Sequence, residues 1–317
     1  MDFPKTPLIF AVNKPPQMTS NDVVYYFKKN LSFEFGKIGH FGTLDPFASG
    51  LLLIGIQGAQ KINDFIHELH PKTYYAKGFF GEKTISGDYT SEVVESRSID
   101  TLWLNSELSD LEIAIKKKYL GEYWQKPHQI SATKFQGKRL YDHAKNGVLI
   151  QKDKVKREIF DFRITKFEYP EIEFFVTVSS GTYVRSFFED ISEYLGGVGH
   201  LKQLERSAVG DLLLEKATNK DSWPTKNMNY FEISQLAYTV DQVLVLNRIE
   251  LNSEKSKRFL QGVRFRSDQF EIVHNKNKLS TDKYYWVYKH VTGELLGMGQ
   301  LVSSELHALF TYQNSIL

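Results

Sequence analysis

One loop constrains the fold more than any other part of this chain: residues 36–50 set a single aspartate, Asp45, among four glycines. Glycine permits backbone conformations and close approaches that other residues resist, and Pro46 favours an extended conformation for the aspartate before it. The run at 51–56 is apolar apart from one glycine, which is typical of a buried strand. The sequence therefore predicts a loop that presents Asp45 just before a buried strand.

The same glycines do not match the patterns of nucleotide-binding loops. No Gly-Lys-Ser/Thr follows them, as a phosphate-binding loop of the Walker type requires, and their spacing does not fit Gly-x-Gly-x-x-Gly. The alternative interpretation of Asp45 is an ordinary Asp-Pro turn in a tight loop. The loop residues alone leave that alternative open.

The whole string Gly-x-x-Gly-His-x-Gly-Thr-Leu-Asp-Pro-x-Ala-x-Gly resembles the catalytic motif of the TruB family of tRNA pseudouridine synthases. Other segments resemble the same family in the same order, over residues 9 to about 215. They are Lys-x-Tyr at 72–74, Thr-x-Ser-x-Asp at 84–88, Gly-Thr-Tyr-Val-Arg at 181–185 and Leu-x-Arg-x-x-x-Gly at 204–210. The family usually has Thr where this chain has Phe41 and Ser86.

The resemblance implies an α+β fold of the pseudouridine synthase type, with a mixed, mainly antiparallel sheet flanked by helices. It implies a catalytic domain over residues 1–243, with an RNA-gripping insertion at about 120–155 that closes over an RNA stem-loop. Short β-like runs at 284–288 and 293–301, with turn residues between them, favour a small β-rich domain of the PUA type over 244–317.

Charge is distributed unevenly, although the net charge is only +2. Residues 116–157 hold 12 Lys and Arg against 3 Asp and Glu, whereas residues 81–113 hold 2 against 8. Lysine and arginine neutralise phosphates, and aromatic rings stack on unpaired bases. The rings in the basic segment are those of Tyr119, Tyr123, Trp124, His128, Phe135 and Tyr141. A solvated basic face is the alternative, but this mixture favours an RNA partner.

Composition excludes several other kinds of protein. The chain has no cysteine, which excludes disulfides, thiolate zinc sites and thiol nucleophiles. No apolar run approaches the roughly 18 residues that a membrane-spanning helix needs. His67 and His70 lie three apart on a predicted helix without a third ligand nearby, which indicates two surface histidines rather than a metal site. We expect a cytoplasmic monomer without metal, nucleotide or other cofactor.

Arg185 falls in the first turn of a helix predicted from Val184 onwards. A cation there opposes the helix dipole, so it needs a carboxylate partner. Glu189, four residues on, is the partner that helical spacing suggests. The resemblance to the family favours Asp45 instead.

The resemblance further implies a reaction: isomerisation of uridine 55 in the T-loop of tRNA to pseudouridine. Chemistry at the anomeric carbon calls for a carboxylate near the sugar, and Asp45 is that nucleophile by resemblance. By the same resemblance Arg185 orients Asp45, Tyr74 stacks on the target base and takes part in proton removal, and His40 helps to extrude that base. We expect the substrate contacts at Lys14, Lys134, Lys138 and Tyr183. The alternatives are a glycoside hydrolase, a non-catalytic RNA-binding protein, and a synthase that acts on a different uridine or a different RNA.

Overall fold

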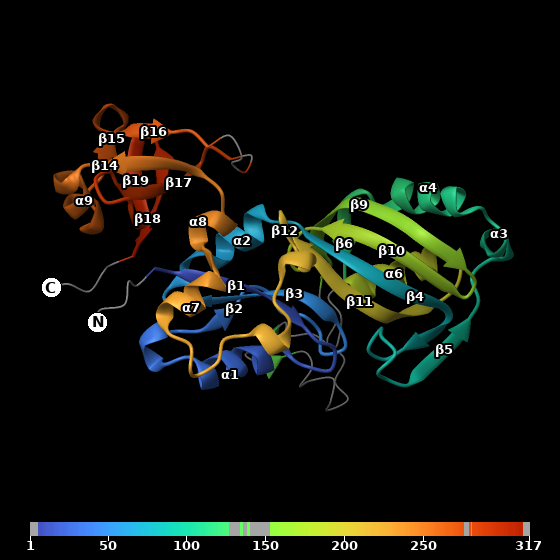
Figure 1. The fold of residues 1–317 in the computed structure, drawn as a ribbon. Coiled ribbons are helices and arrows are strands. Elements are labelled where there is room, and N and C mark those ends of the chain that lie inside the picture. Colours follow the sequence, from blue (N-terminus) through green and yellow to red (C-terminus); the bar gives the residue numbers. More distant parts are fainter. Residues whose placement is uncertain are drawn as a thin grey trace.

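A computed structural model describes residues 6–126, 134–135, 138–139, 153–275, 279 and 281–312 of the 317-residue chain. Two sheets lie side by side (Figure 1), with the second sheet at one end of the molecule and α3 and α4 at the other. The large sheet is mixed but almost entirely antiparallel, with helices packed against it, which confirms the predicted α+β fold class.

The large sheet has eleven strands among the described residues, and eight of them form its main path. In order across the sheet these are β13 (Tyr238–Thr239), β1 (Leu8–Lys14), β3 (Ser49–Ile56), β11 (Gly199–Val209), β4 (Lys72–Thr84), β10 (Glu171–Val178), β9 (Val155–Glu168) and β6 (Gly121–Gln125). Off this path, β2 (Gly39–His40) pairs with β3, β5 (Val93–Arg97) with β4, and β12 (Leu212–Leu213) with β11. Among the strand pairs of this sheet that the structure describes, only β3 and β11 run parallel.

The helices and single 3₁₀ turns lie between these strands. The helices are α1 (Ser20–Asn30), α2 (Asn63–Leu69), α3 (Thr101–Leu104), α4 (Leu108–Tyr119), α6 (Val184–Tyr194), α7 (Tyr230–Gln235), α8 (Val240–Val243) and α9 (Ser253–Leu260). The turns are η1 (Phe33–Phe35), η2 (Ala59–Ile62), η3 (Leu214–Lys216), η4 (Lys220–Ser222) and η5 (Ser267–Gln269). Helix α1 begins at a reciprocal capping box that Thr19 and Asp22 form.

Strands β1 and β3 are apolar over most of their length, at 8–12 and 51–56, and both of their faces are buried there. On one face, Phe10 and Leu52 join the main core, which α1 and α6 cover. On the other face, Ile9 and Leu53 join a second cluster. Strand β4 alternates buried and half-buried residues along most of its length, as expected for a strand with one core face.

One glycine shows how closely the main helix approaches the sheet. A Cβ on Gly78 of β4 would lie 2.2 Å from the ring of Phe188 on α6, well inside van der Waals contact. Only glycine at this position lets α6 settle against β4. The approach matters for the site, because the same helix carries Arg185 in its first turn.

The second sheet contains β15 (Phe265–Arg266), β19 (Glu305–Thr311), β18 (Glu294–Val302), β17 (Tyr284–Lys289), β14 (Asn247–Leu251) and β16 (Glu271–Val273), in that order. It has a core of its own around Phe259 and Val287. Its β17 and β18 also contribute Trp286 and Met298 to the second cluster, beside Ile9. We propose that the domain division lies at residues 243 and 244 as predicted, between α8 and β14, because a separate core follows that point.

The predicted RNA-gripping insertion lies mostly outside the described residues. Strand β6 ends at Gln125 and its partner β9 begins at Val155, so the chain leaves and re-enters the sheet at paired positions. Between them the structure describes only β7 (Lys134–Phe135) and β8 (Lys138–Arg139), which form a two-stranded ladder. The side chains of this ladder lie outside the described part.

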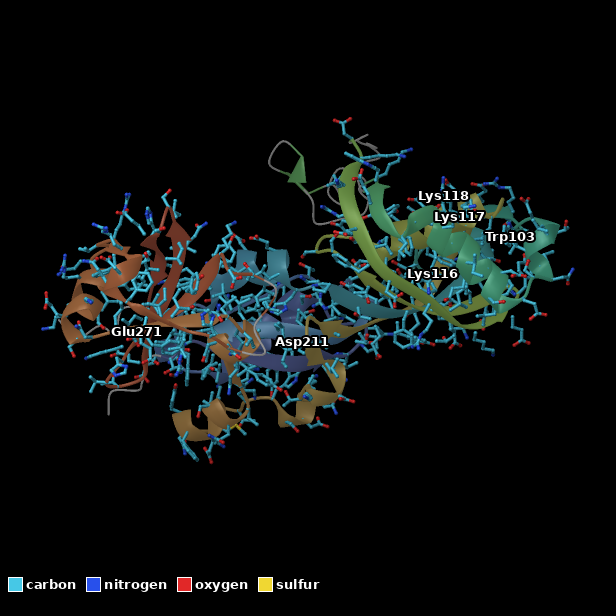
Figure 2. All side chains as sticks on the ribbon, turned by 90° about the horizontal axis from the view of Figure 1, so that it is seen from above. Trp103, Lys116, Lys117, Lys118, Asp211 and Glu271 are labelled. Atoms are coloured by element: carbon cyan, nitrogen blue, oxygen red, sulfur yellow. The ribbon has the colours of Figure 1, made fainter. Side chains whose placement is uncertain are left out.

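The first part of the basic segment lies on α4 rather than in the insertion. Figure 2 shows Lys116, Lys117 and Lys118 along this helix, far from Glu271 on the second sheet. Lys116 pairs with Glu112 on the same helix at 2.8 Å. These three lysines therefore lie on the surface of α4. The charge of Lys116 is paired with a carboxylate of the protein itself, so this part of the basic segment is not all available to RNA.

Candidate active site

The Asp45 loop is held to the start of α1. Leu44 donates its backbone N–H to the hydroxyl of Ser20 at 2.9 Å, and Gln17 donates its own to the carbonyl of Pro46 at 2.7 Å. Asp45 follows Leu44 in this pinned segment, and its side chain is 28% exposed. The loop therefore presents a fixed carboxylate that remains open to solvent.

Arg185 reaches Asp45 from the first turn of α6 and contacts it with two prongs. Its Nε donates to Oδ2 and its Nη2 donates to Oδ1, both at 2.9 Å. The arginine side chain is only 4% exposed. Paired hydrogen bonds of this kind between ionised groups are stronger and more directional than single ones, so Arg185 fixes both the position and the rotation of the carboxylate.

A second carboxylate, that of Asp88, holds Arg185 from behind. Its Oδ2 lies 3.6 Å from Arg185 Nη1, and its side chain is 5% exposed. The same Nη1 donates to the carbonyl of Ser86 at 2.5 Å. Asp88 in turn accepts hydrogen bonds from the Ser86 hydroxyl and from the backbone and side chain of Thr90. The loop after β4 is thus built around the guanidinium.

The structure decides between the two predicted partners of Arg185. The carboxylates of Asp45 and Asp88 both lie at the guanidinium, so the contact predicted from the family resemblance is present. Glu189 lies one turn further along α6, where burial raises the pKa of its carboxyl to about 7. Helical spacing alone would not have predicted the contact between Arg185 and Asp45.

Tyr74 is buried in the main core. Across the sheet, Tyr74 of β4 is aligned with Arg206 of β11, which is aligned with Gly50 at the start of β3. Its ring belongs to the same core cluster as Leu44 and Val184, the residues that precede Asp45 and Arg185. Tyr74 therefore shares the main core with the residues that precede Asp45 and Arg185, and its predicted role stays a prediction.

Three buried cations lie on strands β1, β4 and β11, which we call the inner side of the Asp45 loop, and each donates to backbone carbonyls. We call Lys14, Lys72 and Arg206 the carbonyl-bound cations. Arg206 donates to the carbonyls of Leu51 at 2.7 Å and Gly42 at 3.3 Å. Lys14 donates to Pro15 and Met18, and Lys72 donates to Ile66 and His70. Among the described residues, none of the three has a carboxylate within 4 Å in an ion pair. Arg206 thereby ties together the two ends of the Asp45 loop.

Burial makes two of these cations easier to deprotonate than usual. It lowers the pKa of Lys72 to about 7, with a smaller contribution from the charge of Arg206. It lowers the pKa of Lys14 to about 8, although Asp45 acts in the opposite direction.

Gly50 lets β3 approach β11 closely beside Arg206. Its φ is +108°, and a Cβ would lie 2.5 Å from the carbonyl oxygen of Arg206.

A cavity of about 450 Å³ opens beside His40. It lies between α1, β2 and η2, with Lys28 and Lys37 exposed at its rim. His40 is half-buried, and burial lowers the pKa of its imidazole, with Arg206 contributing. The cavity combines positive charge with amide and imidazole groups, and it adjoins the chain segment that leads into the Asp45 loop. The complete lining is Asn21, Val24, Lys28, Lys37, Ile38, Gly39, His40, Gln60 and Asn63.

Two sequence predictions about basic residues are wrong. Lys14 is fully buried and donates to two carbonyls, so it is not placed to contact a phosphate. His70 is not a surface histidine: it is buried, and its Nε2 lies 3.1 Å from the carbonyl of Val243. His67 is half-buried and bonds to the hydroxyl of Ser180 at 2.6 Å. A run of sequence gives no sign that a lysine will be enclosed by carbonyls.

Of the aromatic residues expected to meet RNA bases, two face inward. Tyr119 and Tyr123 direct their hydroxyls to Asp190 of α6, the first to its carbonyl and the second to its carboxylate. Trp124 is exposed at 50%. Tyr183 is half-buried at the start of α6. Lys134 lies on β7 and Lys138 on β8, with their side chains outside the described part.

The sequence reasoning gave no role to Asp88 or Arg206, although both lie in segments that it singled out. Asp88 is the last residue of the Thr-x-Ser-x-Asp string, and Arg206 is the arginine of Leu-x-Arg-x-x-x-Gly. The only sequence sign of either residue was a charged side chain within a segment that matched the family.

The described residues contain no group of three or more His, Cys, Asp or Glu side chains arranged to hold a metal ion. No helix among them is long and apolar enough to cross a membrane.

Comparison with known proteins gives consistent results. A family model described as the N-terminal domain of TruB family pseudouridylate synthases matches residues 28–184. The chain is 32% identical over 277 residues to tRNA pseudouridine synthase B of Pasteurella multocida, covering 86% of this chain and 87% of that protein. It is 36% identical over 213 residues to the protein of that name from Ureaplasma urealyticum, covering 66% and 89%.

A solved structure extends the likeness to nearly the whole chain. A protein chain from the crystal structure of a Cbf5–Nop10–Gar1 complex superposes with a TM-score of 0.68 at 18% identity. The superposition covers 96% of this chain and 85% of the other. At that identity the likeness concerns the fold alone.

Proposed function

Because the chain belongs to the TruB family of pseudouridylate synthases, we propose that it isomerises uridine 55 in the T-loop of tRNA, with Asp45 as the nucleophile. The observation that carries this proposal is the two-pronged contact between Arg185 and Asp45. It holds a carboxylate in one orientation and leaves it partly exposed to solvent. The wider family supplies the substrate class: the curated relatives are named for tRNA.

The reaction moves a base without adding or losing atoms. The bond between N1 of uracil and C1′ of the ribose breaks, the detached uracil turns, and C5 bonds to C1′. The proton on C5 then leaves and N1 regains a proton, so the product is an isomer of the substrate. A carboxylate at C1′ supports both halves, since it can bond to or stabilise the electron-poor sugar carbon while the base turns.

In this proposal the other residues prepare that encounter. Arg185 occupies both oxygens of Asp45 and limits its rotation, so little reorganisation remains at the moment of reaction. Tyr74, from the main core, stacks on the extruded uracil and takes part in removal of the C5 proton. His40 enters the space that the target base leaves, because a base inside a folded loop must leave its stack before its sugar is accessible.

The cavity beside His40 suits the RNA next to the target. We propose that Lys28 and Lys37 at its rim bind backbone phosphates there, a role that Lys14 cannot fill from the interior. Lys134, Lys138 and Tyr183 remain proposed RNA contacts. We further propose that the protein acts as a monomer in the cytoplasm.

The test uses purified protein, an unmodified tRNA transcript and a chelator, followed by mapping of pseudouridine at single-nucleotide resolution. We expect one pseudouridine, at position 55, and none in a transcript that carries cytidine there. Pseudouridine at a different position would contradict the assigned target. Activity that requires an added metal ion or nucleotide would contradict the cofactor-free reaction.

Asp45→Asn is the matched variant, because it keeps the size of the side chain and removes its charge. We expect no detectable turnover, with tRNA affinity within about threefold of the unaltered protein, since phosphate contacts elsewhere supply most of the affinity. Multiple turnover by a pure Asp45→Asn preparation would show that another group does the chemistry.

A further inference from the structure

The N-terminus of α6 is held by a side chain that belongs to neither the helix nor the Asp45 loop. Gln125, the last residue of β6, is 2% exposed. Its Oε1 accepts a hydrogen bond from the backbone N–H of Tyr183 at 2.8 Å, and its Nε2 donates to the carbonyl of Tyr183 at 2.9 Å. One amide group thus clamps both polar backbone atoms of a single residue, 58 positions away in the chain.

That residue is the N-cap of α6. Tyr183 has extended backbone angles, and no side-chain hydrogen bond caps the helix at this position. Its carbonyl also accepts the first helical hydrogen bond, from Phe187 at 3.1 Å. Gln125 therefore fixes the point at which the chain turns into the helix. Arg185 lies only two residues further on.

The orientation of the Gln125 amide is determined by its partners. A reversed amide would place its NH₂ against the N–H of Tyr183 and its oxygen against the carbonyl, so that both contacts would be repulsive. The Nε2 atom has a further neighbour, the hydroxyl of Tyr123 at 3.3 Å, and that hydroxyl donates to Asp190 on α6. The hydrogen bonds of Gln125 are therefore compatible with one orientation of its amide group.

We infer that Gln125 is a positioning residue for the proposed reaction: its amide sets the place and direction from which Arg185 reaches Asp45. The two prongs of Arg185 require the guanidinium plane to match the carboxylate, and a small shift of the helix N-terminus breaks that match. Misplacement of a catalytic group by about 1 Å costs up to about a hundredfold in rate. This role rests on the proposed function, whereas the clamp itself does not.

The test compares Gln125→Met with Tyr119→Phe. Gln125→Met keeps the length of the side chain and removes both polar contacts with Tyr183. Tyr119→Phe removes one hydrogen bond to the same helix, at the carbonyl of Asp190, far from the N-cap. Both variants loosen α6, but only the first acts where Arg185 is set. Thermal unfolding of each checks that the variants are folded.

For Gln125→Met we expect the single-turnover rate to fall at least about tenfold, with tRNA affinity within about threefold. We expect Tyr119→Phe to keep the rate of the unaltered protein. A folded Gln125→Met variant with full rate would overturn the inference. So would an equal loss of rate in Tyr119→Phe, because loosening of the helix in general would then explain both.

A second measurement does not need RNA. In protein labelled with ¹⁵N-arginine, the Nε–H of Arg185, identified by its loss in Arg185→Lys, should exchange slowly because it donates to Asp45 in a buried position. We expect exchange at least about tenfold faster in Gln125→Met and unchanged in Tyr119→Phe. Unchanged exchange in Gln125→Met would overturn the inference. If the unaltered protein failed to modify tRNA, the proposed function would fail while this measurement still judged the clamp.

Discussion

Buried cations surround the Asp45 loop on two sides, and they are held in different ways. On the outer side, Arg185 is bound by the carboxylates of Asp45 and Asp88. On the inner side, the carbonyl-bound cations Lys14, Lys72 and Arg206 meet backbone oxygens. A cation that faces a partly exposed carboxylate orients a reactive group. A cation that faces carbonyls fixes the course of the backbone. The outer side therefore positions the reactive carboxylate, whereas the inner side stabilises the loop that carries it.

Arg206→Met should break the inner side and have the largest effect. It leaves the buried carbonyls of Gly42 and Leu51 without their donor, at a cost of about 1–3 kcal/mol each. We expect the midpoint of thermal unfolding to fall by about 5–10 °C, measured by calorimetry, and the loop to lose its fixed shape. An unchanged midpoint would show that Arg206 does not contribute to the stability of the folded protein.

Arg185→Lys should break the outer side while leaving the fold intact. The charge is kept, but lysine cannot offer the two parallel donors that bind both oxygens of Asp45. We expect the single-turnover rate to fall about a hundredfold, equivalent to about 2.7 kcal/mol, with a melting midpoint within about 2 °C. A lysine variant with full rate would mean that only charge matters at this position.

Asp88→Asn tests whether the outer side needs its second carboxylate. The variant keeps the shape of the side chain and an acceptor for Thr90 but removes the charge behind Arg185. We expect a loss of about tenfold in single-turnover rate, equivalent to about 1.4 kcal/mol. Glu189→Gln is the control, since it removes a carboxylate one turn along the same helix. An equal loss in the control would point to the summed charge around α6 instead.

Lys72→Met sharpens the comparison through pH. The pKa of Lys72 is lowered by burial to about 7, below the ordinary value of 10.5 that applies in the unfolded chain. Between these values the unfolded chain binds more protons, so stability rises with pH. We expect the melting midpoint of the unaltered protein to rise by a few degrees from pH 7 to 9 and that of Lys72→Met to rise less. Parallel curves would show that Lys72 keeps its usual proton affinity.

The sequence predicted the elements that local pattern controls. The local pattern gave β3, α6, β17 and β18 close to their observed bounds. The family motifs gave the contact between Arg185 and Asp45, which the fold forms. These successes share a cause: each rests on residues near one another in the chain or on a matched string.

What escaped prediction depends on contacts between distant segments. Lys14 carries the same side chain as a surface lysine, and only the fold encloses it in carbonyls. Gln125 gives no local sign that it clamps Tyr183, because the residues between them, 126–182, include β9, β10 and most of the insertion. Burial and long-range hydrogen bonds arise from the assembled sheet, so no window of sequence contains them.

The cluster shared by the two sheets has a consequence for synthesis on the ribosome. One face of β1 and β3, with Ile9 and Leu53, belongs to a cluster that also holds Trp286 and Met298, which are translated more than 200 residues later. At roughly 5–20 residues per second, this cluster stays incomplete for a time on the order of tens of seconds. The nascent chain thus exposes, from its earliest strands, a surface of the kind that chaperones bind, and it completes its centre only when its last strands arrive.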